Sequence, residues 1–359
     1  MPLDVESTIK NINARIGWRM TRNLLGKECG ITALGPGLFI ERAVNQSSKD
    51  VSISSKIDKF WRHLIYSGDR LIKIYPLNPV EMSKVQSALL NHKADNSSFN
   101  QSFPVPISTS ELAVADQNLH FAEASSFIYD SHNVISSALL SKAYYTEIIE
   151  LDGSHLSDAG LELKANGGQI KCKQRQMTQC FHNVFLVPSA QILIMSLDLS
   201  SLPRSESSSQ QVLLEAFIRK IAKIKLPKPI NLFPAVSDLY EKPDGRISSI
   251  TFLTGDGNGS TLKLKPGQSC LKGDKYHKGG VSAGSVLTKY KIAKTWDIPM
   301  SGNSLASIEL TLPGKRVMLD DPKKHLHDAT ISNCPTVECL LFTVKRLMAS
   351  LPPISFKSS

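Results

Sequence analysis

The sequence predicts an α+β protein with a mixed N-terminal part and a larger C-terminal part centred on antiparallel strands with flanking helices. Three observations predict this class. Apolar residues recur at helical spacing in several segments, they alternate in others, and glycine turns such as Gly167-Gly168 separate the alternating runs. The chain has 359 residues, more than a single core usually fills, so we expect more than one domain.

The N-terminal part is predicted to span residues 1–92 and to begin with a helix over residues 5–20. The apolar residues of this helix recur every three or four positions: Val5, Ile9, Ile12, Ile16 and Met20. The next elements are expected to be a strand at Leu38 to Val44, a helix over 54–68, a strand over 69–77 and a helix over 78–93. Asn78 can cap the last helix, and Pro79 suits its first position.

Residues 93–110 are rich in Ser and Asn and contain Pro104 and Pro106, so we expect a linker or a long exposed loop there. Residues 111–359 are predicted to form a β-rich α+β domain with a basic surface. Its strands are expected over residues 119–130, 143–152, 160–174, 182–200 and 304–319, with a hairpin over 245–267. Its helices are expected over residues 211–226 and 334–351.

The composition is that of an ordinary globular protein, with 41% hydrophobic and 21% charged residues. The first residues lack the apolar core of a secretory signal, and no apolar run approaches the ~18 residues that a membrane span needs. We therefore expect a cytoplasmic, intracellular protein with no membrane partner. Its six cysteines are sparse and irregularly spaced, which favours reduced thiols over a disulfide framework.

The net charge of +10 favours a polyanionic partner, and the segment from Lys263 to Trp296 contains eight lysines against one acid, Asp274. Lysines neutralise phosphates, and nucleic-acid bases stack on aromatic rings. The predicted nucleic-acid-binding residues are Lys263, Lys265, Lys272, Lys275, Tyr276, His277, Lys278, Lys289, Tyr290, Lys291, Lys294 and Trp296, helped by Arg15, Arg19 and Arg22 of the first helix. The two-residue spacing of Lys289 and Lys291 predicts one strand face. The alternative is a pair of solvated strands with their lysines outward and their aromatic rings buried.

Motifs for other chemistry are weak. The segment LTGDGNGST lacks the Gly-Lys-Ser/Thr of a phosphate-binding loop and is better explained as a hairpin turn. The cysteines and histidines lack the paired spacing of a zinc site, so we predict no metal centre and no cofactor. A catalytic site could be assembled in space from Cys180 and His182, or from His325, His327 and Asp328, although no nucleophile motif accompanies them.

A metal-dependent nuclease is one alternative, because Asp152, Glu162 and Lys164 can be drawn as the carboxylate–lysine set of such enzymes. Glu162 and Lys164 would project on the same face if they lay on a strand, and only this alternative calls for Mg²⁺ or Mn²⁺. The competing explanation is a salt-bridged, exposed strand face.

The leading hypothesis is a non-enzymatic protein that binds DNA or RNA through its lysine-rich surface. The alternatives are a metal-dependent nuclease or phosphoester hydrolase, and a structural or assembly protein that binds an acidic protein partner. Further protein partners or a homo-oligomer are compatible with all three.

Overall fold

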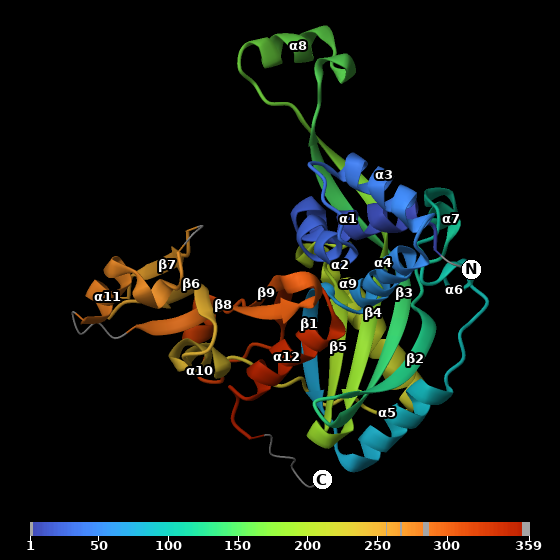
Figure 1. Ribbon diagram of the computed structural model, residues 1–359. Helices are drawn as coiled ribbons and strands as arrows, with labels where there is room; N and C mark the ends of the chain where they lie inside the picture. The colour runs from blue at the N-terminus through green and yellow to red at the C-terminus, as the bar shows by residue number, and fades with distance from the viewer. Residues whose placement is uncertain (1–2, 256, 266–267, 283–286, 354–359) are drawn as a thin grey trace.

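The computed structural model describes residues 3–255, 257–265, 268–282 and 287–353 (Figure 1). Among these residues, ten strands form one sheet in the order β2-β3-β4-β5-β1-β10-β9-β8-β6-β7, and each neighbouring pair is antiparallel. Helices lie against the sheet, so the expected α+β class with a large antiparallel sheet and flanking helices is confirmed.

The strands are β1 (Gly68–Pro76), β2 (His120–Tyr129), β3 (His132–Glu150), β4 (Lys171–Val187), β5 (Ile192–Asp198), β6 (Arg246–Leu253), β7 (Gly259–Lys263), β8 (Thr288–Met300), β9 (Ser304–Leu312) and β10 (Ala329–Cys334). The helices are α1 (Val5–Thr21), α2 (Lys27–Cys29), α3 (Pro36–Ser47), α4 (Val51–Tyr66), α5 (Pro79–Asn91), α6 (Ser98–Ser102), α7 (Thr109–Val114), α8 (Asp158–Ala165), α9 (Ser207–Ala222), α10 (Ala235–Glu241), α11 (Lys275–Ser282) and α12 (Val337–Met348). A π-helical turn, Arg22–Gly26, joins α1 to α2.

The two faces of the sheet bury separate cores. Leu71, Leu139 and Leu193 point to the face that α5 and α9 cover, which we call the α9 face. Ile72 and Phe185 point to the opposite face, beneath α1, α4 and α12, which we call the α4 face. At strands β6 to β9 the α4 face remains apolar, whereas the α9 face carries mainly Ser, Thr, Lys and Glu.

Strand β1 comes from the N-terminal part of the chain but lies in the middle of the sheet. It pairs with β5 on one side and with β10 on the other, and both of these strands come from residues 111–359. The two predicted parts therefore contribute to one sheet. The predicted domain boundaries at residues 92 and 111 stay a prediction.

Local sequence explains the helices that were predicted correctly. The side chain of Asn78 accepts a hydrogen bond from the backbone N–H of Glu81, and the Glu81 carboxylate accepts one from the N–H of Asn78, so a capping box begins α5. Helix α4 begins at Asp50, whose carboxylate accepts the N–H of Ser52. The helices expected over 5–20, 54–68, 78–93, 211–226 and 334–351 are confirmed as α1, α4, α5, α9 and α12.

Two predicted elements are wrong. The strand expected at Leu38 to Val44 is helix α3, because Pro36 begins a helix and Phe39 and Ala43, four residues apart, are both buried. The strand expected from residue 160 is helix α8, and β4 begins only after the turn at Gly167. The segment over 93–110, expected to be a linker or a long exposed loop, contains the short helix α6 and buries Phe99 against the body, and its role as a linker between domains stays a prediction.

His120 holds the segment between α5 and β2 in place. Its Nδ1 lies 2.7 Å from a carboxylate oxygen of Asp95, and its Nε2 lies 3.0 Å from one of Asp116. Burial lowers the pKa of His120, but the hydrogen bonds to the two carboxylates outweigh it and raise the pKa overall. The segment from 95 to 116 is thereby fixed at both ends to the start of the edge strand β2.

Candidate nucleic-acid interface

Most of the net positive charge of the chain comes from one stretch of the sequence. Residues 219–297 contain 15 lysines and arginines against six acids, a net charge of +9 out of the +10 of the whole chain. This region comprises the end of α9 together with α10, α11 and β6 to β8. In Figure 1, α10, α11 and β6 to β8 lie at one end of the sheet, whereas α9 lies in the main body, where it packs against α5. The part at that end, residues 235–297, has ten lysines and arginines against six acids, a net charge of +4. A polyanion would therefore be drawn to this end of the molecule.

Strand register divides the predicted lysines between the two faces of the sheet. Lys263 pairs with Ser249, and Lys291 pairs with Thr251, which places both lysines on the α9 face. A bulge at Tyr290 changes the alternation, so that Lys289 pairs with Phe252 on the α4 face. The prediction that Lys289 and Lys291 share a face is therefore wrong. The lysines from 263 to 294 do not form a single surface.

Lys294 is a structural residue rather than an available cation. Its side chain is 1% exposed and lies beneath the end of α10. The ammonium donates to the carbonyls of Leu239 at 2.8 Å and Lys242 at 2.9 Å, and it lies 3.2 Å from a carboxylate oxygen of Asp244. Burial lowers the pKa of Lys294, while the Asp244 carboxylate opposes that shift. Lys294 thus satisfies carbonyls that the helix leaves without intrahelical partners.

Trp296 is a core residue. It is 5% exposed, its indole N–H donates to Asp244 at 3.0 Å, and its ring packs edge-on against Phe342 of α12. The alternative in which the aromatic rings of this segment are buried therefore applies to Trp296. A base could stack on this ring only if the local structure opened.

Two more of the predicted cations cover an aromatic ring. Lys272 and Lys289 lie 4.7 and 4.2 Å from the ring centroid of Tyr240, and Lys289 also pairs with Glu241 at 3.3 Å. The Tyr240 hydroxyl and Nε2 of His277 lie 2.8 Å apart. Burial lowers the pKa of His277, partly offset by the neighbouring Asp274. This cluster therefore packs α10 and α11 together.

Of the eight predicted lysines, five remain available for a partner: Lys263, Lys265, Lys275, Lys278 and Lys291. All five are exposed, and none takes part in an ion pair among the described residues. We call them the exposed-lysine set. Tyr290 is half-buried, and the side chain of Tyr276 lies outside the described part of the structure.

The predicted arginines of α1 lie elsewhere. Arg15 is almost fully buried and pairs with Asp198, with Nη2 and Oδ1 2.8 Å apart, so it is not available for a phosphate. Arg19 and Arg22 are exposed, but α1 lies over the central strands, away from β7 and α11 (Figure 1). The predicted residues therefore do not come together as one site.

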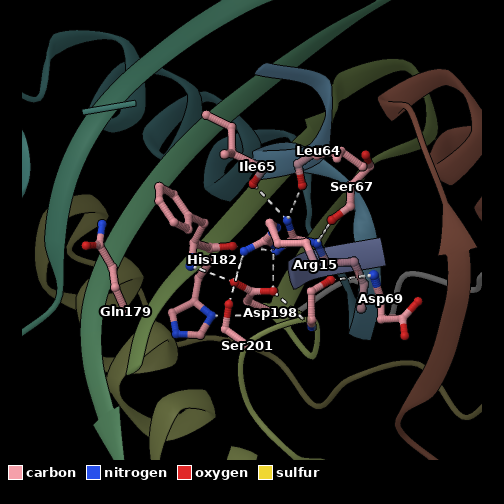
Figure 2. A network of polar contacts seen from close by, with 12 residues as sticks. Arg15, Leu64, Ile65, Ser67, Asp69, Gln179, His182, Asp198 and Ser201 are labelled. Atoms are coloured by element: carbon pink, nitrogen blue, oxygen red, sulfur yellow. Dashed lines mark hydrogen bonds and ion pairs between the residues drawn. The ribbon is translucent and has the colours of Figure 1, made fainter. Parts of the chain in front are cut away.

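A buried polar network lies where α4 ends and β1 begins (Figure 2). Arg70, fully buried, donates to the backbone carbonyls of Leu64, Ile65, Ser67 and Phe181. Burial lowers the pKa of Arg70 to about 10, partly offset by Asp198. The guanidinium thus satisfies the last carbonyls of α4, as Lys294 does for α10.

Asp198 is the counter-charge of this network. Its carboxylate accepts from Arg15 and from the N–H groups of Phe181 and Ser200 at 2.9 and 3.1 Å. Burial raises the pKa of Asp198, but the guanidinium groups of Arg15 and Arg70 outweigh this effect and hold the pKa at about 2. Sequence reasoning missed Arg70 and Asp198, although each is a charge inside an apolar strand.

Ser141, His182 and Asp198 lie close together and superficially resemble a catalytic triad. The roles do not fit, because Nδ1 of His182 accepts the backbone N–H of Asp198 at 3.1 Å rather than donating to its carboxylate. The other nitrogen, Nε2, faces Oε1 of Gln210 at 3.1 Å, so it carries the proton and cannot take one from Ser141. All are fully buried, and burial lowers the pKa of His182 to about 4. This cluster joins α9 to the sheet.

The nuclease set does not come together either. Glu162 and Lys164 lie on helix α8, where residues two apart point to different sides, so the prediction that they share a strand face is wrong. Lys164 donates to the carbonyl of Leu151 at 2.9 Å, and the Asp152 carboxylate lies 2.9 Å from Nδ1 of His155. Hydrogen bonds from Ser154 and His155 lower the pKa of Asp152 to about 2. Within the described ranges, no three His, Cys, Asp or Glu residues are placed to hold a metal ion.

The other motif residues are structural or exposed. All six cysteines are free, and burial raises the pKa of Cys180 and Cys334 well above its ordinary value. His325 and His327 lie in the segment before β10, where Asp328 pairs with Arg204 at 2.6 Å. His327 Nδ1 lies 3.3 Å from the carbonyl oxygen of Ile230, and His325 Nδ1 lies 3.5 Å from a carboxylate oxygen of Asp321, so these contacts of the two rings are not with a nucleophile.

A comparison with protein-family models finds no match for this chain, and a comparison with curated proteins finds no significantly similar relative. None of the helices that the structure describes is both long enough and apolar enough to cross a membrane.

Proposed function

We propose that this chain is a non-enzymatic nucleic-acid-binding protein that contacts phosphates through the exposed-lysine set of β7, β8, α11 and their flanks. The observation that carries the proposal is the exposed-lysine set itself: five lysines between residues 263 and 291 are exposed, and none has an ion-pair partner among the described residues. Phosphate contacts of this kind release counterions and supply most of the affinity of non-specific binding.

The geometry favours backbone contacts over base stacking. Trp296 is in the core, and Tyr240 lies under two lysine side chains. These two rings are therefore covered and Tyr290 is half-buried, so we expect a duplex to bind at least as well as a single strand. Phosphate contacts carry no sequence information, so binding through them should show little sequence preference.

The α9 face at β6 to β8 is the surface most suited to this role. Lys263 and Lys291 stand on it, and between them lie the hydroxyls of Thr251 and Thr261, with their oxygens 3.1 Å apart. Hydroxyls and lysines are both frequent phosphate contacts. Lys275 and Lys278 lie on α11, which packs on the opposite, α4 face through His277 and Phe252, so they would join this contact only where a polyanion passes around the edge strand β7.

The test is a binding isotherm with a short DNA duplex, an RNA duplex and a single strand at four salt concentrations. The variant replaces Lys263, Lys275, Lys278 and Lys291 with Ala. We expect the log–log salt slope to fall by roughly 0.9 for each phosphate that the variant no longer neutralises, up to about 3.6 for four. Exposed lysines change folding by less than about 0.5 kcal/mol each, so thermal melting should be nearly unchanged.

The matched control removes four exposed lysines outside the region: Lys27, Lys49, Lys84 and Lys93. It carries the same change in net charge, so it should leave the slope almost unaltered. An equal fall in both variants would mean that only net charge matters, which refutes the interface. If the wild type binds no nucleic acid at physiological salt, the proposal fails. The hypothesis to test next is then that the same lysines bind an acidic protein partner. Cleavage of the probe with Mg²⁺ or Mn²⁺ would refute the non-enzymatic part.

A further inference from the structure

Strands β3 and β4 extend beyond the sheet as an arm. The arm comprises residues 143–150 of β3, residues 171–178 of β4 and the connection between them, which contains α8 (Figure 1). Pairing of β3 with β2 ends at Leu140, and pairing of β4 with β5 begins at Asn183. Over the arm, each strand therefore pairs only with the other among the described residues, which leaves two open edges.

An arm of this kind is at most marginally stable by itself. A two-stranded ribbon in water buries too little apolar surface, and three or more strands or a packed helix are usually needed. The α8 tip does not supply this, because Leu161 and Leu163 are 42% and 62% exposed and no residue of the helix is buried. A third strand beside the arm would add both backbone hydrogen bonds and buried area.

The two open edges differ in chemistry. The β4 edge carries Lys171 and Lys173, both exposed, and charged residues of this kind block pairing with another strand, whereas the Arg175 guanidinium lies over β3, 4.0 Å from the ring centroid of Tyr144. The β3 edge has the sequence Tyr-Tyr-Thr-Glu-Ile-Ile over residues 144–149, which strongly favours a strand, and Ile148 is 58% exposed. The β3 edge is thus the one that can accept a further strand.

We propose that the occupant of this edge is a second copy of this chain, with the two β3 edges paired antiparallel about a two-fold axis through Thr146. Such an axis is perpendicular to the sheet and pairs only residues on the same face. Centred on Glu147, it would set two carboxylates opposite each other. An axis centred on Tyr145 would place Lys142 opposite Ile148 of the second copy. The Lys142 ammonium already donates to the carbonyl of Ala113 at 2.8 Å, so its side chain is not free to rearrange. Centred on Thr146, it meets neither obstacle.

The pairing about Thr146 is favourable on both sides of the axis. Tyr144 lies opposite Ile148 of the second copy, and Ile148 opposite its Tyr144, the aromatic and β-branched combination that stabilises neighbouring strands. Glu147 lies opposite Tyr145 rather than another acid. Across residues 144–148 the pairs are therefore Tyr144 with Ile148, Tyr145 with Glu147 and Thr146 with itself, and none of them sets like charges opposite each other.

Antiparallel pairing also brings the tip of each arm beside the base of the other. At the base stands α7, held to β3 by the Lys142 ammonium through the carbonyls of Ala113 and Ala115. The next side chain along α7, Val114, is 86% exposed. Leu161 and Leu163 at the tip of one arm would therefore lie near Val114 at the base of the other. The two-fold axis would produce this apolar contact twice in each dimer.

The experiment is disulfide cross-linking in a Cys172→Ser background, which removes the arm's own thiol. Thr146→Cys places two thiols at the axis, where paired Cα atoms are about 4.5–5.5 Å apart, within the range of a disulfide. We expect most of this variant to run as a covalent dimer after mild oxidation. Gln174→Cys, equally exposed on the β4 edge, is the matched control and should stay monomeric. Failure of Thr146→Cys to cross-link, or equal cross-linking of both, overturns the proposal.

Sedimentation velocity at 1 to 100 μM gives an independent readout without added cysteines. The wild type should shift from monomer to dimer over this range, Thr146→Lys should remain monomeric, and Lys173→Glu should behave as the wild type. Wild type that stays monomeric throughout, or a Thr146→Lys variant that still dimerises, overturns the proposal. The arm lies outside residues 219–297, so this outcome is separate from the test of nucleic-acid binding.

Discussion

Replacing Asp198 with Asn should strongly destabilise the fold. Asp198 is fully buried and is the counter-charge of two buried arginines, Arg15 and Arg70. The substitution keeps the shape of the side chain but leaves both guanidinium groups without a negative partner. Removing one member of a buried ion pair costs far more than the pair contributes, because the remaining charge stays out of water with nothing to compensate it.

Two estimates bound the loss of unfolding free energy. The pKa of Asp198 lies at about 2 against an ordinary value of 3.8, which corresponds to about 2 kcal/mol of preference for the charged form in the fold. Breaking a buried pair by removing one partner typically costs about 3–5 kcal/mol. We therefore expect Asp198→Asn to lose between about 2 and 5 kcal/mol at neutral pH, a large fraction of the stability of a typical domain.

The assay is urea unfolding at pH 7, with Glu6→Gln as the control. Glu6 pairs with Lys10 on the surface, where both side chains are more than half exposed, so its loss should cost under about 0.5 kcal/mol. The depressed pKa of Asp198 gives stability that is complete above about pH 4 and lost as the pH falls towards 2. The gap between wild type and Asp198→Asn should therefore narrow below pH 4. A loss under 1 kcal/mol at pH 7, or a gap independent of pH, would refute the reasoning.

Three further predictions concern single positions. His120→Gln should destabilise most below pH 6.5 and progressively less as the pH rises through the raised pKa of His120, since stability from a raised pKa is lost on deprotonation; urea unfolding at pH 6 and pH 9 checks this. Trp296→Ala should cost about 3–5 kcal/mol by thermal or urea unfolding, while the folded fraction keeps its affinity for nucleic acid. Gly314→Ala should cost about 1–3 kcal/mol because its Cβ would overlap the carbonyl oxygen of Tyr290, whereas Gly37→Ala, which has open space around it, should be neutral or stabilising.

The elements that the sequence predicts best are those whose cause is local. The capping box at Asn78 and Glu81 lies within four residues, and its helix follows directly. The apolar residues from Leu38 to Val44 are compatible with either a helix or a strand. The residue that distinguishes the two is Pro36, which occupies the first helical position, and not the glycines on either side of it. Segments of this length are ambiguous by periodicity alone.

What depends on distant contacts could not be predicted. Strand β1 lies in the centre of the sheet because it pairs with β5 and β10, which are more than a hundred residues away in the chain. The sequence of residues 68–76 does not identify those partner strands. The bulge at Tyr290 has a similar origin, because it is set by the match of β8 to β6. This one-residue shift places Lys289 on the opposite face of the sheet from Lys291.

Buried cations change how net charge should be interpreted in this chain. Arg70 and Lys294 both lie beneath the end of a helix and donate to its last carbonyls, so their charges stabilise the fold and are not available to a partner. The sequence alone counts them together with exposed lysines such as Lys291.

The exposed-lysine set has only five members, and this limits the electrostatic part of any nucleic-acid complex. At roughly 0.9 counterions released for each duplex phosphate, five contacts give a salt slope no steeper than about 4.5. A measured slope well above that value would mean that cations outside the set take part, and Arg19 and Arg22 of α1 would be the first to test. A slope near 4.5 that falls to about 0.9 in the fourfold variant would assign the interface to these five side chains.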